Sequence, residues 1–327
     1  MRAEPPAVDR PLRFGLAGTG YWARTVHAPA LASTAGIELA AVWGRSPQAA
    51  AALAGSYRCA WFSNFDDFLG EVDAIAFAVP PDVQAALAAR AAVAGRHLLL
   101  EKPIAISEQA GDELVRAVQD AGVASVVFFT ARFQADVRAW LASAAEHDWS
   151  GGTAVWLGSA LMVDSPFNTP WRRDKGGLWD LAPHLVSLLW ASLGPVRAVI
   201  ADGGTGDVTH LILHHDGGAS STVTVSIGVP ESAACCEAYL WGEAGRSQAP
   251  EPTRQPADAL RLALTELTAN IRSGRTRHDC DVLFGQAVAG VLSSAQVQID
   301  AARASRGQPS RPVAVGTPRR AARTYSS

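Results

Sequence analysis

The sequence has few cysteines, little net charge and no long uninterrupted apolar run. Four cysteines in 327 residues, with Cys235 and Cys236 adjacent, form neither a disulfide framework nor a Cys-x-x-Cys site. A net charge of −3 gives no electrostatic bias toward nucleic acid or a membrane surface. No segment reaches the roughly 18 consecutive apolar residues of a membrane-spanning helix, and no apolar secretory region follows Met1. We therefore expect a cytoplasmic protein with no nucleic-acid or membrane partner.

The first apolar run of the chain leads into a glycine-rich turn with the spacing Gly-x-Gly-x-x-Ala. Here Gly18 permits a tight turn, Gly20 lets the backbone approach phosphates, and Ala23 lets the following helix pack closely. The spacing alone is weak in a chain with 29 glycines, but a strand-like segment at 37–43 completes a strand–helix–strand unit. We therefore predict a dinucleotide whose pyrophosphate lies at a helix N-terminus. The residues predicted to contact it are Gly18, Thr19, Gly20, Tyr21 and Trp22.

Cofactor specificity should be set where the second strand of this unit ends, at Trp43-Gly44-Arg45-Ser46. An acidic residue there would bind the ribose hydroxyls of NAD. The guanidinium of Arg45 and the hydroxyl of Ser46 instead suit a 2′-phosphate, because arginine makes paired charge-assisted hydrogen bonds to phosphate. The sequence therefore favours NADP over NAD. In the alternative interpretation Arg45 is a solvated loop residue and Ser46 only caps the next helix.

Strands and helices alternate as far as residue 130. Short apolar runs at 73–79, 97–100 and 123–130 are separated by helical segments at 81–94 and 107–121. This rhythm predicts a doubly wound parallel sheet of the α/β class. The strands are nearly continuous apolar runs, which is typical of a sheet covered on both faces.

Beyond residue 150 the strands follow one another without helical crossovers, which predicts a second domain with a largely antiparallel sheet. We expect a nucleotide-binding domain over 1–131, a second domain over 132–310, a flexible leader at 1–10 and a basic disordered tail at 311–327. The predicted strands are 153–162, 196–204, 208–215 and 219–229, and the predicted helices are 177–193, 257–273 and 281–303.

Two charged residues, Glu101 and Lys102, follow the run at 97–100, at the carboxyl end of a predicted parallel strand. Ligands of open α/β sheets bind beside these strand ends, so both side chains should face the crevice. A lysine there can bind a substrate hydroxyl, stabilise negative charge or exchange a proton. The alternative is a surface lysine at a turn before Pro103. The strand end and the upstream glycine turn favour the functional interpretation.

Asp180 and His184 are four residues apart, which places both on one face of a helix. Pro183 suggests that this helix begins near residue 181 or 182. A carboxylate beside an imidazole can raise its pKa and orient its tautomer, as a general acid or base requires. The spacing alone slightly favours the alternative, in which Asp180 caps the helix and His184 is a core histidine.

The ordered set of motifs resembles the Gfo/Idh/MocA oxidoreductases, which include glucose-fructose oxidoreductase and inositol dehydrogenases. The resemblance implies a Rossmann domain followed by an α/β domain with a large open, mainly antiparallel sheet, which often mediates assembly into homo-oligomers. It also implies hydride transfer between a nicotinamide and a sugar-like or cyclic alcohol carbon, with Lys102, Asp180 and His184 at the catalytic positions. The matching segments are Gly18-x-Gly20-x-x-Ala23, 72–81, 94–103, Trp171-Arg172, Gly176-Gly-Leu-Trp-Asp180-x-x-x-His184 and Phe284-Gly285.

The chain departs from the family pattern at a few positions. Gln84 stands where the family often has histidine, and Ala182 and Ser187 replace the glycine and the final acid of Asp-x-Gly-x-His-x-x-Asp. We expect these changes to affect substrate contacts. Trp43 and Gly44 replace the acidic residue common in NAD-using members, which agrees with a preference for NADP.

The mechanism that these residues suggest is a proton-coupled hydride transfer. In the oxidation direction His184 removes the hydroxyl proton, Lys102 stabilises the oxygen and Asp180 holds the imidazole. The nicotinamide would lie near Val79, Pro80, Glu101 and Lys102. We expect substrate contacts from Trp171, Arg172 and Arg132, although an interdomain structural role for Arg132 is an equal alternative.

Other functions are weaker alternatives. His210, His214 and His215 lack nearby cysteines or clustered acids, so we expect no metal site. An NAD(P)-binding sensor or scaffold protein without turnover would have no chemical reason to keep Lys102, Asp180 and His184. Within the family, an NAD-dependent glycosidase or a biliverdin-reductase-like enzyme also stays open, and the sequence does not identify the substrate.

Overall fold

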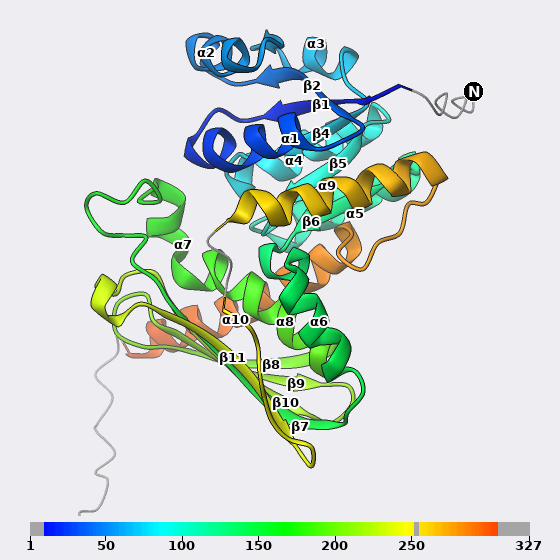
Figure 1. Cartoon of the computed structure of the whole chain (residues 1–327). Helices are drawn as coiled ribbons and strands as arrows, with labels where there is room; N and C mark the ends of the chain where they lie inside the picture. The colour runs from blue at the N-terminus through cyan, green and yellow to red at the C-terminus, as the bar shows by residue number, and fades with distance from the viewer. Residues whose placement is uncertain (1–9, 252–254, 307–327) are drawn as a thin grey trace, which may run out of the picture.

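The computed structural model describes residues 10–251 and 255–306. Nearly all of the predicted leader and the whole of the predicted basic tail lie outside the described residues. Arg10, the last residue of the predicted leader, is described, and it donates two hydrogen bonds of 2.8 and 2.9 Å to the carboxylate of Asp73. The chain forms two sheets stacked end to end, with helices around the first and on one side of the second (Figure 1).

The first sheet is parallel throughout, with the strand order β3-β2-β1-β4-β5-β6. Helices α1 and α9 pack together on one face, and α4 and α5 pack together on the other. This arrangement explains the continuous apolar runs. The strands are β1 (Leu12–Ala17), β2 (Ile37–Trp43), β3 (Ala60–Phe62), β4 (Ala74–Phe77), β5 (His97–Glu101) and β6 (Ser125–Phe128). The helices of this part are α1 (Ala28–Ser33), α2 (Pro47–Tyr57), α3 (Phe65–Gly70), α4 (Pro81–Val93) and α5 (Glu108–Ala121).

The second sheet is mainly antiparallel, with the order β12-β11-β7-β10-β9-β8 and one parallel pair, β7 with β10. Helices α8 and α10 cover one face of this sheet, and the other face is open. The predicted fold class, a doubly wound parallel sheet followed by a mainly antiparallel one, is confirmed. The strands are β7 (Trp149–Leu157), β8 (Val196–Gly203), β9 (Thr209–His215), β10 (Ser220–Ser226), β11 (Cys235–Gly242) and β12 (Gly245–Gln248).

The predicted single helix at 177–193 is wrong in one respect, because it is two helices, α7 (Pro170–Asp180) and α8 (Ala182–Leu193), that meet at Leu181. Gly176 breaks α7 internally, with φ of 63° and ψ of −164°. Pro183 lies in the first turn of α8, where a missing N–H costs nothing. The sequence did not predict β11, β12 or α6 (Ala135–Ala144).

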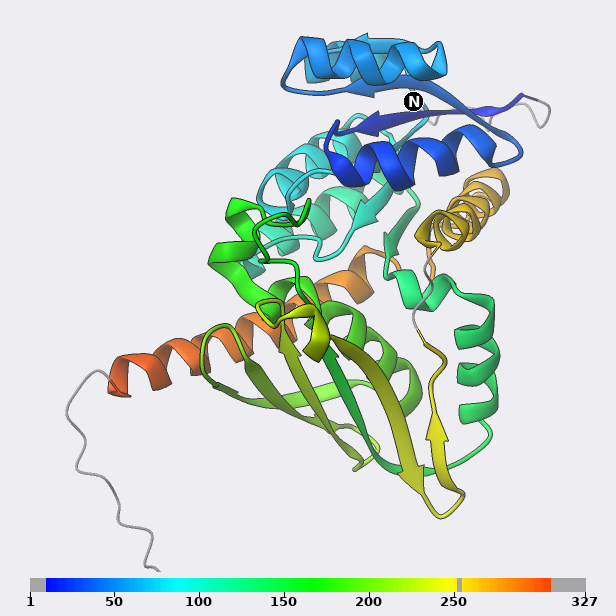
Figure 2. The same ribbon diagram turned by 60° about the vertical axis from the view of Figure 1, so that its left-hand side comes forward.

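The last two helices of the described residues, α9 and α10, join the two halves. Helix α9 (Pro256–Ser273) returns to the first sheet and packs against α1, β5 and β6. Helix α10 (Val282–Arg306) contacts α5 at one end and runs along β8 (Figure 2). Within the part of the chain that the structure describes, the stretch Val282–Ser305 is the one helix long and apolar enough to cross a membrane, and 44% of its apolar window is buried inside the protein.

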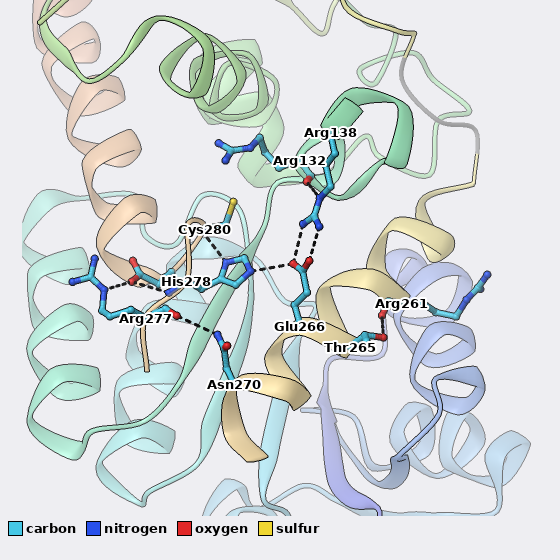
Figure 3. A network of polar contacts seen from close by, with 10 residues as sticks. Arg132, Arg138, Arg261, Thr265, Glu266, Asn270, Arg277, His278 and Cys280 are labelled. Carbon is cyan, nitrogen blue, oxygen red and sulfur yellow. Dashed lines mark hydrogen bonds and ion pairs between the residues drawn. The ribbon is translucent and has the colours of Figure 1, made fainter. Parts of the chain in front are cut away.

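A polar network fastens α9 to α6 and to the loop that precedes α10 (Figure 3). Arg138 donates two hydrogen bonds to the carboxylate of Glu266, one of them 2.8 Å long. Nε2 of His278 lies 3.0 Å from Glu266 Oε2, and the ring stacks on Phe133 with 6.0 Å between centroids. Hydrogen bonds from Arg138 and His278 outweigh the effect of burial and lower the pKa of Glu266 to about 2. Glu266 is therefore an anion at neutral pH, held between two donors.

Candidate active site

A cavity of about 560 Å³ lies where the carboxyl ends of the first sheet meet the second domain. Lys102 of the first domain and, from the second domain, Asp180 and His184 line this cavity. Gly20, Tyr21, Trp22, Val79, Pro80 and Glu101 from the predicted cofactor site also line it. The structure therefore brings the predicted catalytic residues and the nicotinamide end of the predicted cofactor site to one place.

The glycine turn has the shape that a dinucleotide requires. Gly18 has φ of +132°, and a Cβ there would lie 2.3 Å from the carbonyl oxygen of Ala78, so no other residue fits. A Cβ on Gly20 would meet nothing within 4 Å, which leaves open space for a phosphate against the backbone. Ala23 is fully buried and is the first residue of a π-helical turn, Ala23–His27, that leads into α1. These residues fit the pyrophosphate of NAD(P).

Glu101 projects from the end of β5 toward the start of that helix. Trp22 Nε1–H donates a 2.8 Å hydrogen bond to Glu101 Oε1, and His27 Nε2 lies 2.8 Å from the same oxygen. His27 is fully buried. The carboxylate of Glu101 is thus fixed at the cavity wall, beside the predicted nicotinamide site.

Lys102 and Asp180 form a direct ion pair across the two domains. Lys102 Nζ donates to Asp180 Oδ1 at 3.0 Å and to the main-chain carbonyl of Asp180 at 2.6 Å. Arg172 Nε donates to the other carboxylate oxygen at 2.7 Å. Burial alone would raise the pKa of Asp180, but the charges of Lys102 and Arg172 outweigh it and hold that pKa well below its ordinary value. Asp180 is therefore a buried carboxylate with both oxygens paired.

The expected contact between Asp180 and His184 is absent from the described residues, so this prediction is wrong. Asp180 ends α7 and His184 lies in the first turn of α8, and the carboxylate points to Lys102 and Arg172 instead. Nδ1 of His184 is buried without a hydrogen-bond partner. Burial and then the positive charge of Lys102 lower the pKa of His184 well below its usual value, against the opposing effect of Asp180. The imidazole is therefore neutral, whereas the sequence suggested a raised pKa.

Gln84 is one of the site residues whose role the sequence misjudged. It is fully buried, and its Oε1 accepts a 2.8 Å hydrogen bond from the Glu101 N–H while its Nε2 donates to the Glu101 carbonyl at 2.7 Å. Ala182 and Ser187 are also fully buried. None of the three lines the cavity, so the expected effect on substrate contacts is corrected to a structural one.

Asp207 supports the helix that carries Asp180, and no sequence signal marked it. Its carboxylate accepts hydrogen bonds from Gly177 N–H at 3.1 Å, Ile227 N–H at 2.7 Å and the Ser226 hydroxyl at 2.5 Å. The bond to Gly177 fixes the backbone three residues before the end of α7, beside the positive-φ residue Gly176. Only the folded chain brings Asp207 to this helix.

The predicted substrate residues divide between two places. Trp171 and Arg172 line the cavity, and the guanidinium of Arg172 stacks on the Trp171 ring at 4.7 Å. Arg132 does not line the cavity. It donates to the carbonyl of Ser187 at 3.1 Å and lies over the Phe284 ring at 5.5 Å, so the structure places it in the interdomain contact that was the alternative.

The predicted specificity residues lie at the end of β2, next to the glycine turn and outside the cavity. Thr19 packs against Gly44. A Cβ added to Gly44 would lie 2.7 Å from the methyl group of Thr19. Ser46 Oγ caps α2 by accepting from Ala49 N–H at 3.2 Å, as the alternative interpretation expected. Arg45 is exposed. Among the described residues no group of three or more His, Cys, Asp or Glu side chains is placed to hold a metal.

The family model matches the first domain of the chain. Residues 12–129 match the GFO_IDH_MocA family, described as an oxidoreductase family with an NAD-binding Rossmann fold. The chain is 35% identical to inositol 2-dehydrogenase of Rhizobium meliloti over 124 residues, which are 37% of each protein. It is 34% identical to UDP-N-acetylglucosamine 3-dehydrogenase of Acidithiobacillus ferrooxidans over 109 residues, which are 33% of this chain and 34% of that protein. The alignments therefore span about a third of the length of these curated relatives.

The likeness in fold extends over nearly the whole chain. The crystal structure of GenD2 from gentamicin A biosynthesis in complex with NAD matches with a TM-score of 0.80. That match has 18% sequence identity and covers 93% of this chain and 98% of the other. Over residues 12–129 the chain therefore belongs to the Gfo/Idh/MocA family of oxidoreductases, and over nearly its whole length it shares the two-domain fold of the solved structures.

Proposed function

We propose that the protein is an NAD(P)-dependent dehydrogenase or reductase that transfers a hydride between a nicotinamide and a carbon bearing a hydroxyl or carbonyl group. The substrate would be a sugar-like or cyclic small molecule. The observation that carries the proposal is that Lys102, Asp180 and His184 converge on a cavity whose other wall is the glycine turn. The names of the relatives, which are dehydrogenases of inositol and of a nucleotide sugar, support the reaction class.

Lys102 is the residue that would contact the reacting oxygen. An ammonium group has three N–H donors, and two of them are used by the carbonyl and carboxylate of Asp180. The third is available to a substrate oxygen in the cavity, which Lys102 lines. Because Asp180 holds the ammonium by two contacts, Lys102 is already oriented before substrate binds. When bound, the nicotinamide supplies the hydride acceptor or donor.

His184 would exchange the proton. Its imidazole is neutral and lines the cavity, where the ring can meet a substrate hydroxyl. A lowered pKa makes the imidazole a weak base. A hydroxyl that accepts a hydrogen bond from Lys102 becomes more acidic, and this effect compensates for the weak base. We assign Asp180 to positioning Lys102, in place of the imidazole-holding role that the sequence suggested.

We propose NADP as the preferred cofactor. Arg45 is exposed, and the structure gives it no ion-pair partner within the described part of the chain, so its guanidinium is free to bind a 2′-phosphate. The hydroxyl of Ser46 already accepts a hydrogen bond from Ala49 N–H and donates one to Gln48 Oε1. We therefore assign the main contact with the 2′-phosphate to Arg45. The strand before it ends without an acidic residue.

We further propose that the protein is a cytoplasmic homo-oligomer, a dimer or tetramer, assembled through the open face of the second sheet. Three large apolar side chains are exposed on this sheet: Ile200 at 53%, Ile212 at 42% and Trp241 at 38%. Ile200 and Ile212 are paired across β8 and β9, and exposed apolar side chains on a sheet face suit contact with a second copy of the same surface. The four cysteines are free thiols, in agreement with a reducing compartment. Light scattering of the purified protein should give two or four times the mass of one chain.

The test of the proposed function is a titration of the purified protein with NADPH and NADH, followed by nicotinamide fluorescence. We expect binding of both with NADPH tighter. Preference for NADH would contradict the role of Arg45 and leave the proposed reaction intact. If neither cofactor binds and none copurifies, the proposed function is wrong.

A further inference from the structure

One side of the active-site cavity differs from the rest of its wall because it carries no charged side chain among its described residues. The charged residues that line the cavity in the described structure are Glu101, Lys102, Asp180 and Arg172, and each has a partner. The described residues on the side formed by β7, β11, the start of α6 and the part of α8 beyond His184 carry no charge. We call this side the apolar compartment and define it by Gln134, Val137, Trp156, Leu185, Leu188 and Ala238.

The fold builds this compartment directly beside His184. Leu185 and Leu188 follow His184 on α8, so they continue the same cavity wall along the helix. Trp156 lies on β7, with its ring centroid 5.4 Å from that of His184. Ala238 lies on the neighbouring strand β11, opposite Ala154. An apolar group attached to a substrate held at His184 can therefore pack on an aromatic and aliphatic surface.

Gln134 is the one amide in the compartment, and one end of that amide is unused. The residue is 7% exposed. Its Nε2 donates a long hydrogen bond of 3.5 Å to the carbonyl of Glu251, while Oε1 is buried with no partner. A buried acceptor without a partner is costly, and a ligand that donates a hydrogen bond would satisfy it. The other heteroatom nearby, the sulfur of Cys236, is a neutral thiol, because burial raises its pKa to about 12.

We propose that the substrate is an uncharged cyclic alcohol or ketone with an apolar substituent, such as a glycoside with an aromatic aglycone, whose substituent lies in the apolar compartment. A hydroxyl or N–H group on the substituent donates to Oε1 of Gln134. This inference rests on the proposed function, which places the reacting carbon at Lys102 and His184. A phosphate in the compartment would lose its water without meeting a free cation, so a nucleotide-linked sugar does not fit there.

The likeness to sugar-nucleotide enzymes does not oppose this assignment. The family match ends at residue 129, before Gln134, the first residue of the compartment. The structures that resemble the whole chain do so at sequence identities near 20%, which shows the fold alone. Neither comparison therefore states which substrate the residues of the compartment bind.

The test is isothermal titration of the protein, saturated with NADPH, with matched glycosides. The probes are the methyl, phenyl and 4-hydroxyphenyl β-D-glucosides and β-D-galactosides, together with UDP-glucose. A phenyl group buries several more carbons than a methyl group, so we expect phenyl glycosides to bind at least about tenfold more tightly. We expect the 4-hydroxyphenyl compounds to bind about three- to tenfold more tightly again, and UDP-glucose no more tightly than the methyl glycoside.

Two variants assign the effect to the compartment. Ala238→Leu narrows it, so the preference for phenyl over methyl should fall while methyl glycosides still bind. Ala142→Leu adds the same atoms to an exposed position of α6 and is the matched control, with no expected change in glycoside binding. Gln134→Leu keeps the shape and removes the acceptor, so the gain from the 4-hydroxyl group should disappear while phenyl binding stays.

The outcomes separate this inference from the proposed function. Equal binding of phenyl and methyl glycosides, no binding of any phenyl glycoside, or tighter binding of UDP-glucose would overturn the compartment. Oxidation of free sugars without a preference for phenyl glycosides would also overturn the compartment, but it would leave the proposed oxidoreductase function standing. Selective phenyl binding that is lost in Ala238→Leu supports the compartment even if no cofactor turnover follows, a result that would count against the proposed function alone.

Discussion

The replacement Gln84→Leu tests how the chain positions its catalytic lysine. Strand β4 pairs with β5 as far as Leu99, and beyond that point the side-chain amide of Gln84 takes over the pairing. It bonds both the N–H and the carbonyl of Glu101, the residue before Lys102. Leucine has nearly the same volume, so the change removes the polar contacts and little packing.

The expected cost follows from the two main-chain groups that lose their partner. A buried polar group left unsatisfied costs about 1–3 kcal/mol, so two such groups cost about 2–4 kcal/mol after partial relaxation. This is a large part of a total stability of about 5–15 kcal/mol. Because the lost bonds hold the end of β5, we also expect kcat to fall while the Kd for NADPH changes little.

Urea unfolding measures the stability change, and steady-state kinetics measures the effect on turnover. Gln109→Leu makes the same chemical change on the exposed surface of α5 and should alter stability by less than about 0.5 kcal/mol. If Gln84→Leu is as stable as Gln109→Leu and retains full turnover, the amide does not hold the lysine segment and this reasoning is refuted.

Three further predictions concern charge. The Glu266→Gln protein should be about 1–2 kcal/mol less stable than the native protein at pH 7, after allowance for partial exposure. Because the folded pKa of Glu266 is lowered to about 2, this difference should shrink as pH falls from about 4.5 toward 2, which urea unfolding at pH 7 and pH 3 would show. Arg45→Ala should weaken NADPH binding about tenfold or more and leave NADH binding unchanged, measured by nicotinamide fluorescence, and equal losses for both would refute the 2′-phosphate contact. His184 keeps its neutral form well below pH 6.5, so the pH profile of kcat/KM for oxidation should lack a break near 6.5, and a clear break there would contradict the buried neutral imidazole.

The first domain was largely predictable because its signals are local. The spacing from Gly18 to Ala23, the apolar runs and the charged strand end at Glu101 each specify a piece of the fold without reference to distant residues. Parallel sheet topology then brings the strand ends together, so the cofactor wall of the cavity followed from the pattern. The partners of those residues did not follow, since Gln84 reveals its hydrogen bonds only when α4 packs on β5.

The second domain was harder to predict because its site depends on contacts between distant segments. The spacing of Asp180 and His184 suggested one helix, but a break at Leu181 turns the carboxylate toward Lys102 and Arg172. Asp207 reaches Gly177 from a loop thirty residues away in sequence. The pKa of His184 is lowered and not raised, because burial and the charge of Lys102 outweigh the effect of Asp180. The carboxylate of Asp180, which was expected to raise that pKa, is paired with two cations.

The most direct test of the catalytic assignment compares the wild-type protein with Lys102→Met. Reduction of NADP would be followed by the absorbance of reduced nicotinamide, with myo-inositol, D-galactose and the phenyl glycosides as substrates, and NADPH affinity would be measured in parallel. The account predicts that kcat falls by about 10² or more while the Kd for NADPH is nearly unchanged. Wild-type turnover in Lys102→Met would contradict it.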